Sequence, residues 1–221
     1  VEEQSTGTFT LGFGYSSLDD GSVQIGIEES NFLGTGRGVR ANAAVSGSKS
    51  NFRLGITEPY LWDRELLGSL DLFRDEDKYS SVTIERTGID TAVGFRARDN
   101  YYHRISYLLA ETQTTSSSTT ATSISGDDGG KIISEVGYTL SQDKRDNRFD
   151  PREGHYWRLA NSVSGLGGDV QYVKTTARGQ YFIPFAFKRA VLGFDGKIGV
   201  VDGLGENVSR SNRFVIGGRD I

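Results

Sequence analysis

The chain has 221 residues with a formal net charge of −4, and its 29 acidic residues outnumber its 25 basic ones, which argues against a general nucleic-acid partner. It contains no cysteine, so disulfides and thiolate metal sites are excluded. Only 36% of its residues are hydrophobic and no run of about 18 apolar residues occurs, which excludes a helical membrane protein but not a membrane β-barrel, where only alternate residues are apolar.

The first predicted strand, residues 8–15, alternates in side-chain character at every step. Its apolar members are Phe9, Leu11, Phe13 and Tyr15, and its small or hydroxyl members are Thr8, Thr10, Gly12 and Gly14. Successive side chains of a strand point to opposite faces, so this segment has one apolar face and one polar or empty face. The pattern is typical of a wall that separates hydrocarbon from water.

The same period of two continues along the chain and predicts ten further strands. They are predicted at about residues 23–28, 39–46, 52–57, 66–74, 82–98, 102–112, 132–141, 155–164, 170–183 and 190–201. Turns join them, together with an acidic loop at residues 75–77 and a Ser/Thr-rich loop at residues 112–125. The prediction is an all-β, antiparallel, up-and-down meander of about eleven strands, and it is an incomplete barrel because closed bacterial barrels have even strand numbers.

The two ends of this meander differ in composition. Pro59, Pro151 and Pro184 all follow even-numbered strands and therefore share one end, whereas the acidic and Ser/Thr-rich loops share the other. Outer-membrane barrels have compact turns on the periplasmic side and longer loops outside. We therefore assign the end that carries the prolines to the periplasm.

Charged residues lie on the face opposite the apolar one. They are Arg40, Arg53, Asp71, Arg96, Arg104, Glu135, Arg158, Asp195 and Lys197. In a soluble β-sandwich or β-solenoid, the alternative with the same period, these charges would occupy a dry core, where their unpaired burial is costly. A wetted lumen holds them at little cost, so the pattern favours a transmembrane barrel.

Several motifs together resemble one family. They are Thr6-Gly7-Thr8-Phe9 with Gly12-Phe13-Gly14-Tyr15, residues 29–36, residues 58–64, residues 143–147 with Pro151 and Gly154, and Gly167-Gly168-Asp169 followed by Lys174. In this order and spacing they resemble the barrel of the BamA family of outer-membrane insertases over essentially the whole chain. The resemblance implies that residues 1–7 end a linker from a periplasmic POTRA region. It also implies that residues 8–221 are the first part of a barrel of about sixteen strands, with residues 214–219 at the start of the long external loop.

The resemblance also implies a function. Residues 8–15 would form a lateral gate with the last strand of the barrel, and an incoming strand would add to the opened edge by β-augmentation. The implied partners are unfolded outer-membrane β-barrel clients, accessory lipoproteins of the assembly complex and lipid of the bacterial outer membrane. The alternative is a passive pore or translocation channel of the same superfamily, such as a two-partner secretion or TamA-like protein.

The residues themselves leave the first strand open between a gate and an ordinary wall strand. Its small inner side chains permit bending or a change of register, and glycine equally suits the curvature of a wall. In a bilayer every backbone donor and acceptor needs a partner, so a poorly paired edge is a reactive surface. Near the predicted periplasmic end, five aromatic residues are expected to act as interfacial anchors: Trp62, Tyr101, Tyr102, Tyr156 and Trp157.

No catalytic constellation, cofactor motif or metal site is expected. His103 and His155 lie beside turns and are predicted to be interfacial or loop residues. Asp143, Asp146 and Asp150 suggest a cation site by their spacing, but the arginines among them favour a charge-paired turn. With the lateral gate that the resemblance implies, the expected mechanism is strand templating and membrane perturbation, without bond chemistry.

Overall fold

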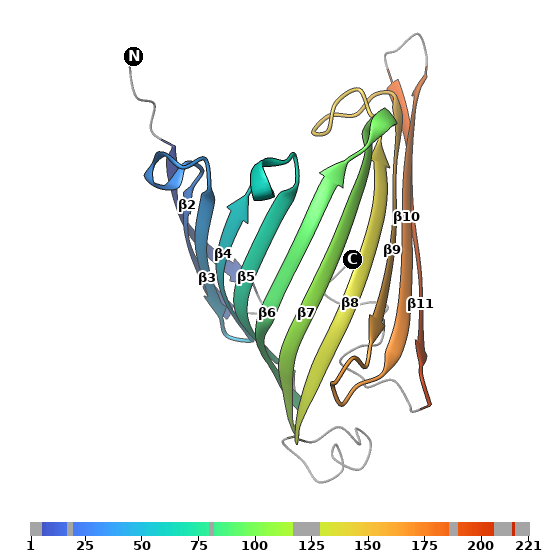
Figure 1. The fold of residues 1–221 in the computed structure, drawn as a ribbon. Coiled ribbons are helices and arrows are strands. Elements are labelled where there is room, and N and C mark those ends of the chain that lie inside the picture. Colours follow the sequence, from blue (N-terminus) through green and yellow to red (C-terminus); the bar gives the residue numbers. More distant parts are fainter. Residues whose placement is uncertain are drawn as a thin grey trace.

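The computed structural model describes residues 6–16, 20–79, 82–116, 129–185, 190–205 and 214. These residues form one antiparallel sheet of eleven strands whose spatial order follows the chain, and β1 and β11 are not paired with each other (Figure 1). The strands are β1 (Gly7–Ser16), β2 (Asp20–Glu29), β3 (Gly38–Ser46), β4 (Lys49–Glu58), β5 (Leu67–Lys78), β6 (Val82–Arg96), β7 (Tyr101–Ser116), β8 (Gly129–Asp143), β9 (Gly154–Ser164), β10 (Tyr172–Phe185) and β11 (Ala190–Gly203). The predicted up-and-down sheet that does not close is confirmed. Within the described ranges, no helix has the length and apolar content needed to cross a membrane.

Because of the register between neighbouring strands, the apolar residues line up on one face of the sheet and the polar residues on the other. Opposite residues of antiparallel neighbours lie on the same face, so one row from β1 to β5 consists of Phe9, Ile27, Ala41, Leu54 and Leu72. Apart from the alanine, these side chains are 47% to 65% exposed. A continuous apolar surface of this kind is typical of a face that lies against lipid. We call it the outward face, and the opposite side of the sheet the inward face.

The inward face is the more crowded of the two. Phe73, Ala92, Ala110 and Ile133 point to it, and none of them is more than 8% exposed. Side chains on the concave side of a curved sheet converge, which is why burial gathers there. A side chain at Gly88 would not fit, because a Cβ atom would lie 2.5 Å from the carbonyl oxygen of Leu109 on β7.

Ion pairs cross the inward face between neighbouring and next-neighbouring strands. Arg40 on β3 reaches over Gly55 on β4 and donates to both carboxylate oxygens of Asp71 on β5, at 2.6 and 2.8 Å. Two further pairs join adjacent strands: Arg104 with Asp90 at 3.1 Å, and Arg178 with Asp195 at 2.5 Å. Several charged residues that were predicted to face a wetted lumen therefore lie on the inward face, where they form ion pairs.

Three successive turns at the predicted periplasmic end share one backbone geometry. Each contains a short 3-10 turn: η1 (Phe32–Gly34), η2 (Leu61–Asp63) and η3 (Arg98–Asn100). The second residues of these turns are Leu33, Trp62 and Asp99, with φ of 53°, 56° and 58°. Left-handed backbone costs a non-glycine residue about 1–2 kcal/mol. In η3, which joins β6 closely to β7, this conformation matches the twist of the flanking strands, as in a type I′ hairpin turn.

Two segments that composition assigned to loops are partly strand. Residues 75–77 continue β5 and pair with residues 49–51 of β4, where Lys49 binds Asp77 at 3.7 Å. Residues 112–116 continue β7, since threonine suits a strand as well as a polar loop. Residues 117–125 of the predicted Ser/Thr-rich loop lie outside the described residues. Composition alone misplaced these strand ends because it contains no information on which strand pairs with the segment.

The loop after β9 completes the edge of β8. β9 ends at Ser164 opposite Glu135, so none of the described strands lies beside the earlier part of β8 on that side. The N–H of Asp169 donates to the carbonyl of Ile132 at 2.8 Å, and the Asp169 carboxylate accepts the N–H of Ile132 at 2.7 Å. A Cβ atom on Gly168 would lie 2.6 Å from that carbonyl oxygen. Close backbone pairing at this edge therefore explains the Gly-Gly-Asp motif.

Candidate functional site

All residues predicted for the gate, 8–15, lie in β1. Their backbone pairs with β2 without a break, from Gly7 opposite Glu29 to Ser16 opposite Asp20. Alternate residues of an antiparallel strand direct their N–H and C=O groups to opposite sides. About half of the polar backbone groups of β1 therefore point away from β2. Of the predicted linker, residues 1–5 lie outside the described range, and Gly7 already belongs to β1.

The two faces of β1 differ sharply in bulk. The outward residues are Phe9, Leu11, Phe13 and Tyr15, which are 52% to 82% exposed. On the inward face, a Cβ atom added to Gly14 would lie 2.7 Å from the hydroxyl oxygen of Ser22 on β2. A hollow of about 330 Å³ lies against Gly12 and Gly14 and extends toward β3 and β4. The wall at β1 thus carries large side chains toward lipid and almost none toward the lumen.

Backbone hydrogen bonds and apolar cross-strand pairs such as Phe9 with Ile27 attach β1 to β2. At the start of the strand the hydroxyl of Thr6 donates to the carboxylate of Glu29, and the carbonyl of Thr6 accepts the N–H of Ser30 at 3.2 Å. Among the described residues, no side chain between positions 8 and 15 makes a hydrogen bond or ion pair. The next strands are held more firmly, because the Arg40–Asp71 pair joins β3 to β5.

Two of the five predicted interfacial anchors meet on the outward face. The rings of Tyr101 on β7 and Trp157 on β9 contact edge to face, with centroids 5.9 Å apart. Between them in the register lies Gln142 on β8, whose side-chain oxygen accepts the indole N–H of Trp157 at 3.1 Å. A third anchor, Trp62, lies in η2 and is 76% exposed.

The other two aromatic residues lie on the inward face. The hydroxyl of Tyr102 covers Gly94, where an added Cβ atom would lie 2.1 Å from it. The ring of Tyr156 lies 5.0 Å from the guanidinium carbon of Arg145. Neighbouring residues of a strand face opposite sides, so Tyr101 and Tyr102, or Tyr156 and Trp157, cannot both face lipid. Trp62, Tyr101 and Trp157 therefore remain the candidates for the anchor role.

A histidine and two aromatic residues form a cluster on the outward face that the sequence analysis did not single out. Phe95 and His103 stack with ring centroids 4.8 Å apart, and Nδ1 of His103 lies 2.8 Å from the hydroxyl oxygen of Tyr138. The signal was present in the sequence, since counting outward from the turn at residues 98–100 places Phe95 opposite His103. The other histidine, His155, approaches Gln142 at 3.4 Å on the same face.

The acidic turn after β8 is charge-paired, as predicted. Arg145 donates twice to the carboxylate of Asp143, at 2.8 Å each, and Arg148 approaches the same carboxylate at 3.3 Å. A further pair joins Asp150 with Arg152 at 3.5 Å. Within the part of the chain that the structure describes, no group of three or more acidic or histidine side chains is placed to hold a metal ion.

Asp146 orders this turn in a different way. Its side-chain oxygen accepts the backbone N–H groups of Arg152 at 2.9 Å and Glu153 at 3.1 Å. These hydrogen bonds favour the ionised carboxylate and hold the pKa of Asp146 below its ordinary value. The turn therefore has a defined shape, although Phe149 at its tip is 100% exposed.

A family model described as the Omp85 superfamily domain matches residues 31–221. The outer membrane protein assembly factor BamA of Neorickettsia risticii (strain Illinois) is 27% identical over 221 residues, which cover 98% of this chain and 30% of that protein. A SAM50-like protein of Drosophila melanogaster is 27% identical over 195 residues, covering 83% of this chain and 43% of that protein. The chain therefore spans less than half the length of these relatives.

Solved structures show the same architecture. The crystal structure of BamA from Haemophilus ducreyi lacking POTRA domains 1–3 matches with a TM-score of 0.86 and 18% sequence identity. The match covers 99% of this chain and 46% of that chain. At this level of identity the likeness establishes the shared fold.

Proposed function

The chain belongs to the Omp85 superfamily and is a protein of the bacterial outer membrane, and on that premise we propose that it folds and inserts outer-membrane β-barrel proteins. Unfolded barrel proteins are the proposed clients, and accessory lipoproteins are the proposed partners at the periplasmic end. The proposed mechanism is templating: β1 forms a lateral gate with the last strand of the complete barrel and offers its edge to a client strand.

The observation that carries this proposal is that the described side chains of residues 8–15 in β1 make no polar attachment to β2. Between residues 8 and 15 the described structure shows backbone pairing to β2 and no side-chain hydrogen bond or ion pair. Backbone pairing can shift in register or open at one end more readily than a strand braced by packed or charged side chains. The inward glycines, Gly12 and Gly14, add little bulk that would oppose such a movement.

The hydrocarbon of the bilayer strengthens the attraction between an exposed strand edge and a client strand. A backbone N–H or C=O group without a partner costs several kcal/mol in lipid, so an exposed edge and an unpaired client strand each lower their free energy by pairing. The client adds by β-augmentation, in which the main chain supplies most of the attraction. No covalent bond forms or breaks, and client sequence matters only through side chains that fit the two faces.

The apolar residues of β1 span only a short distance across the membrane, which supports local thinning of the surrounding bilayer. Its outward residues run from Phe9 to Tyr15, six steps that span about 20 Å of strand. At a tilt of about 40° this corresponds to roughly 15 Å of membrane thickness, compared with an apolar band of about 25 Å in outer-membrane barrels. We propose that the bilayer thins beside β1 to match, which lowers the barrier to insertion, and that Trp62, Tyr101 and Trp157 fix the depth of the barrel.

Cysteine crosslinking tests the gate directly, because the chain has no cysteine of its own. Single variants Thr8→Cys, Thr10→Cys and Gly12→Cys would be made in the complete protein and supplied with a barrel client whose assembly is arrested, carrying one cysteine in its first or last strand. We expect crosslinks in a ladder, in which each step of two residues along β1 shifts the client position by two. The matched control is Thr57→Cys, which lies on the inward face of an interior strand.

A second arm separates assembly from stability. Proline at Phe9, Leu11 or Phe13 removes a backbone donor from β1 and should reduce client assembly more than proline at Phe52 or Leu54 in β4, among variants that still fold as judged by heat-modifiable gel mobility. Equal crosslinking at Thr10 and Thr57, or equal tolerance of proline in both strands, would rule out the gate. Porin-like ion conductance together with normal client assembly in every β1 variant would favour a passive channel.

A further inference from the structure

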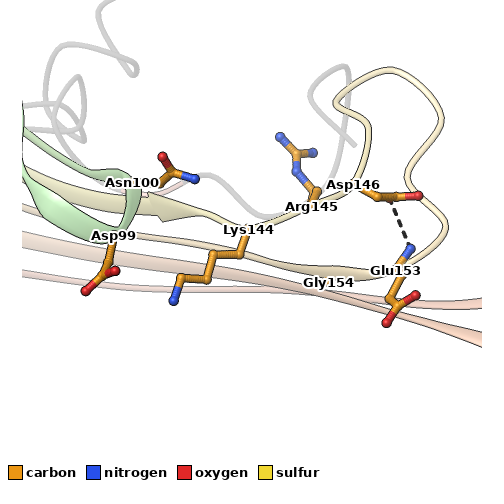
Figure 2. Close-up of a pocket in the computed structure, with 7 residues that line it drawn as sticks. All are labelled: Asp99, Asn100, Lys144, Arg145, Asp146, Glu153 and Gly154. Atoms are coloured by element: carbon orange, nitrogen blue, oxygen red, sulfur yellow. Dashed lines mark hydrogen bonds between the residues drawn. The ribbon is translucent and has the colours of Figure 1, made fainter.

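A polar cleft lies at the periplasmic end of the sheet, beside the membrane-facing aromatic pair. It has a volume of about 530 Å³ and is formed between the turn that contains η3 and the turn after β8 (Figure 2). Its charged lining comes from Asp99, Lys144, Arg145, Asp146 and Glu153. Nothing in the proposed gating mechanism uses this cleft.

The cleft opens on the outward face. Lys144 follows Gln142 by two residues, and its N–H donates to the carbonyl of His155 at 2.8 Å, so the strand pairing continues one step past β8. Lys144 therefore points to the same side as Gln142, which is the side of Trp157. Figure 2 shows Asp99 and Lys144 projecting to one side of the strands and Arg145 to the other. The cleft thus lies just beyond the Tyr101–Trp157 pair, at the depth where lipid headgroups meet an aromatic girdle.

Two of the five charged side chains are already engaged. Arg145 is held by Asp143 and donates to the side-chain oxygen of Gln180 at 3.2 Å, and Asp146 accepts two backbone N–H groups. Among the described residues, the side chains of Asp99, Lys144 and Glu153 have no hydrogen-bond or ion-pair partner. The available charges in the cleft are therefore one cation and two carboxylates.

The positions of these charges are set by rigid turns. Asp99 has a left-handed backbone with φ of 58°, and its carbonyl accepts the side-chain N–H of Gln142 at 2.9 Å. Lys144 and Glu153 lie on the two arms of the turn that Asp146 orders. A ligand of complementary charge would meet fixed backbone positions and would order few side chains on binding.

We propose that this cleft binds the headgroup of a zwitterionic phospholipid with a primary ammonium group, such as phosphatidylethanolamine. The ammonium of Lys144 binds the phosphate, and the carboxylate of Asp99, which lies at the same end of the cleft (Figure 2), accepts hydrogen bonds from the ammonium of the lipid. The acyl chains then lie along the outward face beside Tyr101 and Trp157. The two carboxylates, one on each side of Lys144, repel a purely anionic headgroup, and a quaternary ammonium has no N–H to donate to Asp99.

Native mass spectrometry of the complete protein tests this site without any client, so the result does not depend on the insertion activity. The protein would be released from detergent in the presence of phosphatidylethanolamine, phosphatidylcholine or phosphatidylglycerol, and retained lipid would be counted. We expect Lys144→Gln to reduce the retention of phosphatidylethanolamine by about tenfold, the scale of one charge-assisted hydrogen bond. Asp99→Asn should remove the preference for phosphatidylethanolamine over phosphatidylcholine.

The matched control is Lys197→Gln, which removes the same charge from the inward face of β11, opposite Arg178. Heat-modifiable gel mobility shows that each variant is folded, and Asp99→Asn provides an independent test if Lys144→Gln does not fold. Three results would overturn the proposal: undiminished retention in Lys144→Gln, an equal loss in Lys197→Gln, or wild-type retention of phosphatidylglycerol equal to that of phosphatidylethanolamine.

Discussion

Alanine at Gly55 should weaken the brace between β3 and β5. The side chain of Arg40 crosses β4 directly above this glycine to reach Asp71. A Cβ atom at position 55 would lie 2.4 Å from Oδ1 of Asp71 and 2.7 Å from Nε of Arg40, distances that neither atom tolerates. Gly55→Ala must therefore push the two charged groups apart or displace both of them into the lumen.

The expected cost follows from the exposure of the pair. Breaking a buried ion pair costs about 3–5 kcal/mol, but only the Asp71 side chain is well covered, at 11% exposure against 39% for Arg40. Solvent screening of Arg40 reduces the estimate to about 1–2 kcal/mol. Replacing glycine by alanine within a strand returns about 0.5 kcal/mol through backbone entropy. The net destabilisation should be about 1 kcal/mol.

Urea unfolding of the complete protein in lipid vesicles measures this difference. The control is Gly179→Ala in β10, where an added Cβ atom meets nothing within 4 Å, and it should be neutral or slightly stabilising. In an Arg40→Ala background Gly55→Ala should cost less, because no ion pair remains to be broken and the Asp71 side chain is free to turn away from the added methyl group. The reasoning is refuted if Gly55→Ala and Gly179→Ala have the same unfolding midpoint, or if the cost of Gly55→Ala is unchanged without Arg40.

Three further variants test other parts of the fold. Gly88→Ala brings a Cβ atom within 2.8 Å of the backbone of Ala110, which cannot swing aside, and should lower stability by about 2 kcal/mol in the same urea assay, more than Gly55→Ala. Ser164→Ala removes a buried hydroxyl that donates to the carbonyl of Val170 at 2.8 Å, and should speed amide exchange in the loop after β9, while unchanged exchange would contradict the assignment. The pKa of Asp146 is lowered from 3.8 in the folded turn, so its stabilisation is complete above that pH and is lost as the pH falls through the lowered value. The protection of the amides in that turn, measured relative to their intrinsic exchange rate at each pH, should fall on acidification in the wild type and be low at every pH in Asp146→Ala.

Much of the fold was predictable because its signals are local. Alternation identified eleven strands and their two faces, and glycine, proline and charged clusters marked the turns between them. The errors lie at strand ends such as residues 75–77, where acidic side chains resemble a loop but pair with β4. The prediction of five interfacial anchors was inconsistent with the alternation of side chains along a strand. Tyr102 and Tyr156 must point to the opposite face from their outward neighbours Tyr101 and Trp157.

The candidate sites depended more on the partner strands. Residues 8–15 were identified as a strand with one empty face, but only the structure showed that the described side chains of this segment make no hydrogen bond or ion pair with β2. The cleft beside Lys144 was not predicted, because it is formed by two turns that are more than 40 residues apart in the chain. The cluster of Phe95, His103 and Tyr138 likewise combines residues from three strands.

By itself the sequence determined that this protein is a sheet of strands with one apolar face, one polar face and two ends of different composition. Side-chain direction and turn chemistry are set by each residue and its immediate neighbours, so these features can be read along the chain. Only the tertiary structure decided which residues meet across the ribbon: Arg40 with Asp71 over a glycine, and the Gly-Gly-Asp loop against the edge of β8. The physical reason is register. A slip of one residue between strands would keep every strand and turn in the chain but would turn one whole strand over, and only the packing of both faces forbids it.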